Sequence, residues 1–185
     1  MRLPVGVLLA VTVLGGCSGT AEPAPTVPAT TAPTTYELAP RTVRPDEVAL
    51  RGEPVVEGST SFSLIGLSTG MTALIGSHAE FEADGQFVRI RLVVVNVGRS
   101  GVLFDTKRQL LVLADGGTHP PHRSTMITKR QPDTFDLGAG VRVEFDLYYD
   151  VPVDAEPVAL RAFGGGTLTD MKDEEGTDLP LEPVP

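Results

Sequence analysis

The stretch that decides the predicted fold is Val141-Arg142-Val143-Glu144-Phe145-Asp146-Leu147-Tyr148-Tyr149-Asp150-Val151. Its odd-numbered positions are all aliphatic or aromatic, whereas four of its five even-numbered positions carry a charge. Successive side chains of a strand point to opposite faces of a sheet. The pattern therefore predicts a β-strand with one buried face and one face exposed to water.

A second run, Phe87–Asn96, repeats this alternation. Its even-numbered positions from 88 to 94 are aliphatic, and Arg89 and Arg91 stand between them. If the two strands are neighbours in one sheet, the outward Arg89 and Arg91 would meet Glu144 and Asp146. Each such pair would add about 0.2–1 kcal/mol. This pairing is a hypothesis about the order of the strands.

Shorter apolar segments predict further strands, with turn residues between them. The segments are Ser61–Leu67, Met71–Ile75, Val102–Asp105, Gln109–Ala114, Pro157–Phe163 and Thr177–Leu181. The turn signals include Ser68-Thr69-Gly70, Asp84-Gly85 and Gly138-Ala139-Gly140. Gly or Pro interrupts every candidate helical window, so no helix longer than one turn is expected. About seven or eight short strands predict an all-β, two-sheet sandwich.

The N-terminus has the layout of a secretory signal peptide over residues 1–16. Arg2 supplies a positive charge, residues 3–14 carry none, and two glycines precede Cys17. The uncharged run is shorter than the ~20 residues that a membrane-spanning helix needs. Leu14-Gly15-Gly16-Cys17 resembles the bacterial lipobox, which implies cleavage after Gly16 and acylation of Cys17. The alternatives are an ordinary secretory signal with a chance cysteine and an uncleaved anchor.

Residues 17–52 are predicted to hold the lipidated cysteine and a linker, and 53–182 the folded domain. From Ser18 to about Pro45 the chain is rich in proline and threonine. It lacks enough apolar side chains to offset the entropy of ordering. We therefore expect a disordered stalk that joins the domain to a lipid on the extracytoplasmic face of the cell membrane, with the bilayer as a partner through acylated Cys17.

The charge balance excludes one class of partner. Lys and Arg number 15 against 24 Asp and Glu, a formal net charge of −9. Nucleic acids are bound through clustered Lys and Arg, so no nucleic-acid partner is expected. Cys17 is the only cysteine, so the domain is predicted to contain no disulfide. Abundant Ala, Gly, Pro, Val and Arg with a single Asn fit a GC-rich bacterial genome, such as an actinobacterial one.

Several segments together carry a resemblance to a known family. They are Gly85–Gly98, Phe104-Asp105, Leu111–Gly117 and Leu137–Pro152. In pattern and order they resemble the telokin-like immunoglobulin domain of bacterial lipoproteins, a domain of unknown function related in fold to the mycobacterial immunoprotective extracellular protein. The resemblance implies an immunoglobulin-like β-sandwich outside the cytoplasm, with no active-site residue. Where the family has Leu-Pro-Gly before the late strand, this chain has Leu137-Gly138-Ala139-Gly140.

Candidate metal ligands are few. His119-Pro120-Pro121-His122 has a spacing that metal sites use, and Met126 is a possible soft partner for copper or zinc. A site needs three or four converging ligands, so an exposed, proline-braced loop is the favoured interpretation. The acidic run 170–178 lacks the alternating oxygen ligands of a calcium loop. No cofactor is predicted.

No catalytic signature is found in the sequence. A Ser-x-x-Lys pair and a His-Glu-x-x-His helix are missing, and no serine is expected at the strand-to-helix turn that defines a serine elbow. Glu144 and Asp146 are expected on the wet face of a strand. The predicted function is therefore a non-catalytic, membrane-anchored binding module with an envelope protein or glycan as partner. The alternatives are a small-molecule or metal carrier that uses the His119 and His122 loop, and a structural envelope protein with no discrete ligand.

Overall fold

The computed structural model describes residues 42–50, 52–76, 80–167 and 175–183. The predicted signal peptide, the cleavage residue Gly16 and the lipidation residue Cys17 lie outside the described residues, as does most of the predicted linker. The part of the chain from Pro40 onward forms one compact unit. Within the described ranges no helix is both long and apolar enough to cross a membrane.

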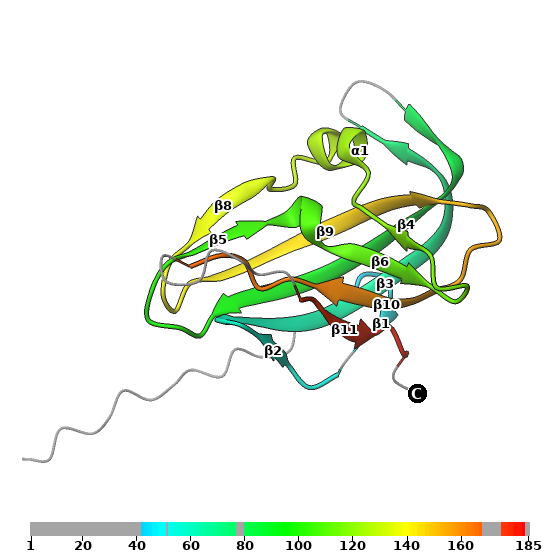
Figure 1. The fold of residues 1–185 in the computed structure, drawn as a ribbon. Helices are drawn as coiled ribbons and strands as arrows, with labels where there is room; N and C mark the ends of the chain where they lie inside the picture. The colour runs from blue at the N-terminus through cyan, green and yellow to red at the C-terminus, as the bar shows by residue number, and fades with distance from the viewer. Residues whose placement is uncertain (1–41, 51, 77–79, 168–174, 184–185) are drawn as a thin grey trace, which may run out of the picture. The chain divides into compact units, whose positions relative to one another are not determined.

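The larger layer is a five-stranded antiparallel sheet (Figure 1). Its members are β1 (Val48–Ala49), β2 (Val55–Glu57), β3 (Thr60–Ile75), β4 (Glu80–Asn96) and β9 (Arg142–Val151). Strand β4 lies between β3 and β9, and the two short strands β1 and β2 both pair with the outer edge of β3. Arg91 lies opposite Asp146, which confirms the predicted pairing of the strand at 87–96 with the strand at 141–151.

The facing layer has two parts. A four-stranded sheet in the order β11-β10-β6-β7 lies beside the two-stranded ribbon β5-β8. Their bounds are β5 (Val102–Asp105), β6 (Leu110–Leu113), β7 (Thr118–His119), β8 (Thr134–Leu137), β10 (Pro157–Ala162) and β11 (Thr177–Pro180). These two layers confirm the predicted all-β, immunoglobulin-like sandwich.

A phenylalanine cluster joins the layers. Phe104 of β5 is fully buried, and its ring centroid lies 6.0 Å from Phe62 of β3 and 5.9 Å from Phe145 of β9. Phe135 of β8 completes the cluster at 5.3 Å from Phe104. The predicted core residue Phe145 is 5% exposed, so its assignment to the core is confirmed.

Two predicted turns are wrong, because their glycines lie inside long strands. Ser68-Thr69-Gly70 forms an irregularity within β3, where the register with β4 shifts between Ser68 and Met71. Gly70 has a φ of +71°, which favours glycine, and its N–H donates to Oε1 of Gln86 at 2.8 Å. Gly85 continues β4, where a Cβ would collide with the carbonyl oxygen of Val151. Gly70 therefore permits a left-handed backbone conformation inside β3, and Gly85 permits a close backbone approach inside β4.

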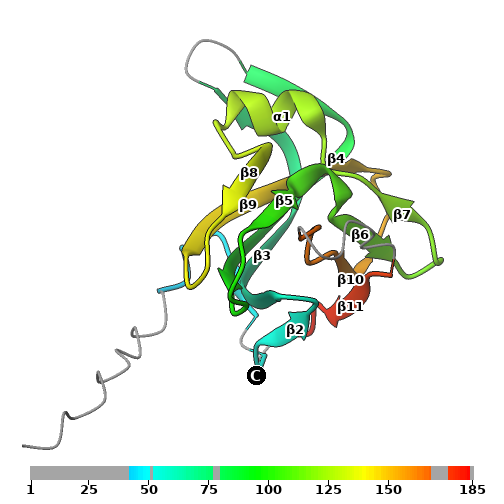
Figure 2. The same cartoon turned by 60° about the vertical axis from the view of Figure 1, so that its left-hand side comes forward.

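The expectation of no helix longer than one turn is also wrong. Helix α1 (Arg123–Thr128) has six residues and lies beside the end of the β3–β4 pair, as Figures 1 and 2 both show. Its flanking residues cover the free edge of β9: the N–H of His122 donates to the carbonyl of Tyr148 at 2.7 Å, and Oε1 of Gln131 accepts from the N–H of Asp146 at 2.8 Å. An exposed strand edge invites pairing with other chains, and this segment blocks it.

The packed structure includes residues before Glu53, the predicted start of the domain. Strand β1 pairs with Leu67 and Gly66 of β3, and Leu50 is 1% exposed. The N–H of Leu50 donates to the carbonyl of Ile65 at 2.9 Å. The segment upstream of Glu53 is therefore part of the sandwich from residue 42 onward.

Candidate functional site: a strap over a buried charge cluster

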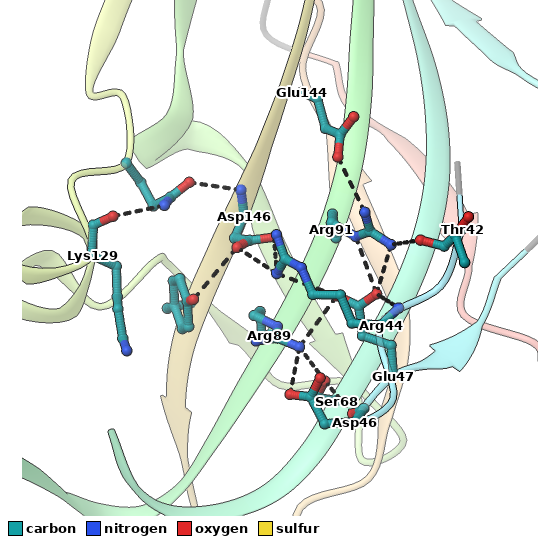
Figure 3. Close-up of polar contacts among 12 residues, drawn as sticks. Thr42, Arg44, Asp46, Glu47, Ser68, Arg89, Arg91, Lys129, Glu144 and Asp146 are labelled. Atoms are coloured by element: carbon teal, nitrogen blue, oxygen red, sulfur yellow. Dashed lines mark hydrogen bonds and ion pairs between the residues drawn. The ribbon is translucent and has the colours of Figure 1, made fainter. Parts of the chain in front are cut away.

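Residues 42–50 form a strap across the outer face of the five-stranded sheet (Figure 3). At one end, Arg44 contacts Asp146 of β9. In the middle, Asp46 and Glu47 contact the two arginines of β4. At the other end, β1 pairs with β3. The strap turns back at residues 44–47, where the N–H of Glu47 donates to the carbonyl of Arg44 at 3.0 Å. Its side chains reach β9 and β4, and its last residues pair with β3.

Arg91 is held mainly by the strap. Its Nε and Nη2 atoms both donate to Oε2 of Glu47, at 3.1 and 2.8 Å. Its Nη2 also donates to the carbonyl of Thr42 at 2.8 Å, and its Nη1 to Oε1 of Glu144 at 3.2 Å. The side chain of Arg91 is 6% exposed and that of Glu47 is 0% exposed. This guanidinium and its main carboxylate are therefore almost fully removed from water.

Arg89 has a similar set of partners. Its Nη2 donates to Oδ2 of Asp46 at 2.8 Å, to Oε1 of Glu47 at 3.2 Å and to the hydroxyl of Ser68 at 3.0 Å. The hydroxyl of Ser68 donates in turn to the carbonyl of Asp46 at 2.7 Å. Two of the three side-chain acceptors of Arg89 thus come from the strap, and the sheet provides the third.

Arg44 completes the cluster from the strap side. Its Nη1 donates to both carboxylate oxygens of Asp146, at 3.2 and 2.9 Å. Burial alone would lower the pKa of Arg44, but the hydrogen bond and charge of Asp146 outweigh it and raise that pKa. Burial and the nearby charge of Asp146 raise the pKa of the Tyr148 hydroxyl. Asp146 thus contacts a group of the strap, Arg44, and the Tyr148 hydroxyl of its own strand.

The predicted wet face of the sheet is therefore covered at this point. Arg89, Arg91 and Asp146 are between 5% and 8% exposed, so the expectation that Asp146 lies on a solvated face is wrong. The side chain of Glu144 retains 23% exposure. The physical reason is the strap: it supplies charges that neutralise the sheet arginines and at the same time excludes water from them.

The charge cluster fixes the position of the strap on the sheet more than it stabilises the fold. Three guanidinium groups, from Arg44, Arg89 and Arg91, face four carboxylates, from Asp46, Glu47, Glu144 and Asp146. Because desolvation of buried charges offsets most of their attraction, such a set gives little net stability, whereas removal of one member leaves a charge unpaired. The arrangement therefore holds the strap at one place on the sheet.

The ionisation of Asp46 makes a pH-dependent contribution. Burial would raise its pKa, but a backbone hydrogen bond, the charge of Arg89 and a hydrogen bond from Arg89 together lower it below the usual value. A lowered folded-state pKa means that this contribution is present above about pH 4 and is lost as the pH falls through the folded value.

We therefore expect Asp46→Asn to lower the free energy of unfolding by at most about 1 kcal/mol at pH 7, because the Asp46 side chain is 60% exposed. The difference between wild type and variant should shrink as the pH falls from 7 to 2.5, which denaturant titrations at several pH values measure. A difference that stays constant over this range would contradict the assignment.

The predicted metal candidates do not form a cluster. The side chain of Met126 is 7% exposed and belongs to the hydrophobic core. Nδ1 of His122 lies 2.8 Å from the hydroxyl of Thr125, and the His122 ring packs against Phe87. His119 lies in β7 opposite Leu111. Among the described residues, no group of three or more His, Cys, Asp or Glu side chains is placed to hold a metal ion.

Sequence patterns alone did not reveal the strap. Strand β1 has two residues and shows no periodicity, and the proline and threonine content before it is typical of a linker. One signal was available: two arginines at alternate positions of an otherwise apolar strand require acidic partners. The Asp46-Glu47 pair, which directly follows the last proline of the stalk region, is such a partner.

Comparisons with known proteins support the fold and no closer relationship. No family model matches the sequence, and neither does any curated protein. The crystal structure of the YjhA protein from Bacillus subtilis matches with a TM-score of 0.56 and 16% identity, over 72% of this chain and 99% of that chain. At this identity the match shows a shared fold alone.

Two further solved structures match with lower scores. A conserved hypothetical protein from Bacillus anthracis has a TM-score of 0.49 and 12% identity, over 62% of this chain and 88% of that chain. The secreted protein MPT63 from Mycobacterium tuberculosis has a TM-score of 0.41 and 16% identity, over 69% of this chain and 93% of that chain. The resemblance to a lipoprotein family therefore stays a prediction from the sequence.

Proposed function

We propose that this chain is a lipid-anchored, extracytoplasmic protein of the bacterial cell envelope whose immunoglobulin-like sandwich acts as a non-catalytic binding module for another envelope protein or a glycan. The anchor is the acylated Cys17, and the proline-rich and threonine-rich linker carries the domain away from the bilayer.

The strap is the observation that carries the proposal. Residues 42–50, the first described residues and part of the predicted linker, are fixed to the large sheet by the buried charge cluster and by the pairing of β1. A tether that only connected an anchor to a domain would need no such attachment. Fixing its exit point restricts which surfaces the domain can present, which is useful to a protein that binds a partner while held at a membrane.

One end of the sandwich is the best candidate for the binding surface. Ile75 at the end of β3 is 76% exposed and Ile127 of α1 is 65% exposed. Nζ of Lys129 donates to the carbonyl of Ile75 at 2.6 Å, which brings the helix and the strand end together. Exposed large aliphatic side chains that gather at one place are typical of interaction sites.

The anchor is tested by fractionation of the cells that produce the protein. Wild type is expected to partition with membranes and to carry a mass increase from acyl chains, because each buried CH₂ contributes about 0.8 kcal/mol to membrane binding. Cys17→Ser is expected to move the protein almost entirely to the soluble or secreted fraction. Retention of the Cys17→Ser protein on membranes would contradict lipid anchoring.

The binding role is tested by crosslinking in cells followed by mass spectrometry. A specific partner is expected with wild type and is expected to be lost with Ile127→Ser and Ile75→Ser. Val158→Ser is the matched control, because Val158 is 39% exposed but lies on β10 of the other layer. Absence of any enriched partner would contradict the binding role and favour a structural one.

A further inference from the structure

We propose that the strap is a mechanical joint: under tension along the tether, residues 42–50 detach as a separate unit and lengthen the tether while the sandwich stays folded. The consequence for a membrane-bound protein rests on the proposed function, but the mechanical behaviour is a property of the chain alone. The proposal follows from the position, direction and chemistry of the strap.

Position decides which contacts bear a load first. Any pull on the tether enters the described structure at Thr42 and reaches the rest of the sandwich only through the strap. Because the strap is pulled at its first residue, its contacts are loaded in the order of the chain. Those of Thr42 and Arg44 come first, then those of Asp46 and Glu47, and the pairing of β1 comes last. Contacts that are loaded in sequence break at lower force than contacts loaded together.

The strands beneath the strap are held far more firmly. The β3–β4 pair extends from Thr60 opposite Asn96 to Ile75 opposite Glu80, and β4–β9 from Gln86 opposite Val151 to Val95 opposite Arg142. By contrast, β1 pairs through two residues. The ladder of the large sheet therefore outlasts the strap under the same tension.

Detachment exposes little of the core. Leu50 is the only apolar side chain of the strap that is buried, while Val48 is 51% exposed. The rest of the interface consists of the half-buried Val43 and Ala49, together with ion pairs and polar hydrogen bonds. Released guanidinium and carboxylate groups are hydrated by water, so an opened strap does not create a large apolar surface. The detachment is therefore reversible, and the strap binds the sheet again when the tension falls.

The structure also has a place for the joint to bend. Residues 52–54 are exposed, and no hydrogen bond holds them within the described part of the chain. Directly after them, β2 pairs with β3 at Val55 opposite Phe62. Strand β2 therefore keeps part of the β3 edge covered when β1 leaves, and the unfolding of the strap stops there.

Pulling on single molecules tests the proposal. Cys17 is the only cysteine of the chain, so the unlipidated mature protein can be held by a thiol handle at this residue and by a tag after Pro185. We expect two events. The first is a low-force step that lengthens the chain by at most about 40 Å, because residues 42–52 extend by about 3.3–3.6 Å each. The second is the unfolding of the sandwich at higher force.

Two variants locate the first event. In Cys17→Ser with Gly52→Cys, the handle lies beyond the strap, and the first step is expected to disappear while the second is unchanged; no atom lies within 4 Å of a Cβ built at Gly52. In Glu47→Gln, the first step is expected at a lower force. A single event that includes the whole sandwich, or a first step that persists in the Gly52→Cys protein, would overturn the proposal. Neither outcome depends on lipidation or on a partner, so this test is independent of the proposed function.

Discussion

Phe104→Ala is expected to lower the free energy of unfolding by about 3–5 kcal/mol, the range for removal of a large aromatic side chain from a packed core. Phe104 is 0% exposed, and its ring contacts Phe62, Phe135 and Phe145, which come from three different strands. The cavity would lie between the layers, where surrounding strands cannot close on it. Because single domains have a total stability of about 5–15 kcal/mol, the variant should be close to unfolding.

Chemical denaturation of the purified domain measures this loss. Leu103→Ala is the matched control, since Leu103 is the neighbour of Phe104 in β5 but is 56% exposed. We expect the control to change the stability by no more than about 0.5 kcal/mol. A loss below about 1 kcal/mol in Phe104→Ala would mean that the β5–β8 ribbon does not pack on the large sheet as described.

Glu47→Ala is expected to lower the free energy of unfolding by about 3 kcal/mol. The carboxylate of Glu47 is 0% exposed and pairs with both Arg89 and Arg91. Removing one partner of a buried ion pair leaves an uncompensated charge, which typically costs about 3–5 kcal/mol. The lower end of this range applies because the strap can lift and allow water to reach the two arginines.

The same variant should also loosen the strap in the native state. Hydrogen exchange is expected to become faster at the N–H of Leu50, which donates to the carbonyl of Ile65, while exchange in the β4–β9 ladder changes much less. Glu53→Gln is the control, because Glu53 is exposed and lies outside the cluster. Equal acceleration over the whole sheet would contradict a local role for Glu47.

The long strands were predictable because their signal is local. Alternation in 141–151 and 87–96 reflects one buried face. In the structure that face is buried from Val88 to Val94 and from Phe145 to Val151, whereas Val141 is 45% exposed. The glycines at 70 and 85 were misinterpreted for a physical reason. A glycine that ends a strand and a glycine that allows a bulge or a close backbone contact look the same in a sequence, and only the neighbouring strand distinguishes them.

The strap could not be predicted in the same way. Its position depends on contacts between Arg44 and Asp146, and between Glu47 and Arg91, whose partners lie 102 and 44 residues apart along the chain. No periodicity links such residues. Helix α1 was missed because its six residues are too few for an apolar stripe to emerge, and it is held by its packing against β9.

The sequence by itself determined the all-β class, the strands β4 and β9 and most of their buried faces, since hydrophobic alternation is a property of neighbouring residues. It also carries the signal and cysteine pattern on which the proposed anchor depends. Only the tertiary structure decided that Arg89, Arg91 and Asp146 are buried, and that residues 42–50 cover them. A charge on a strand is exposed or paired according to what lies above it, and here that neighbour comes from a distant part of the chain.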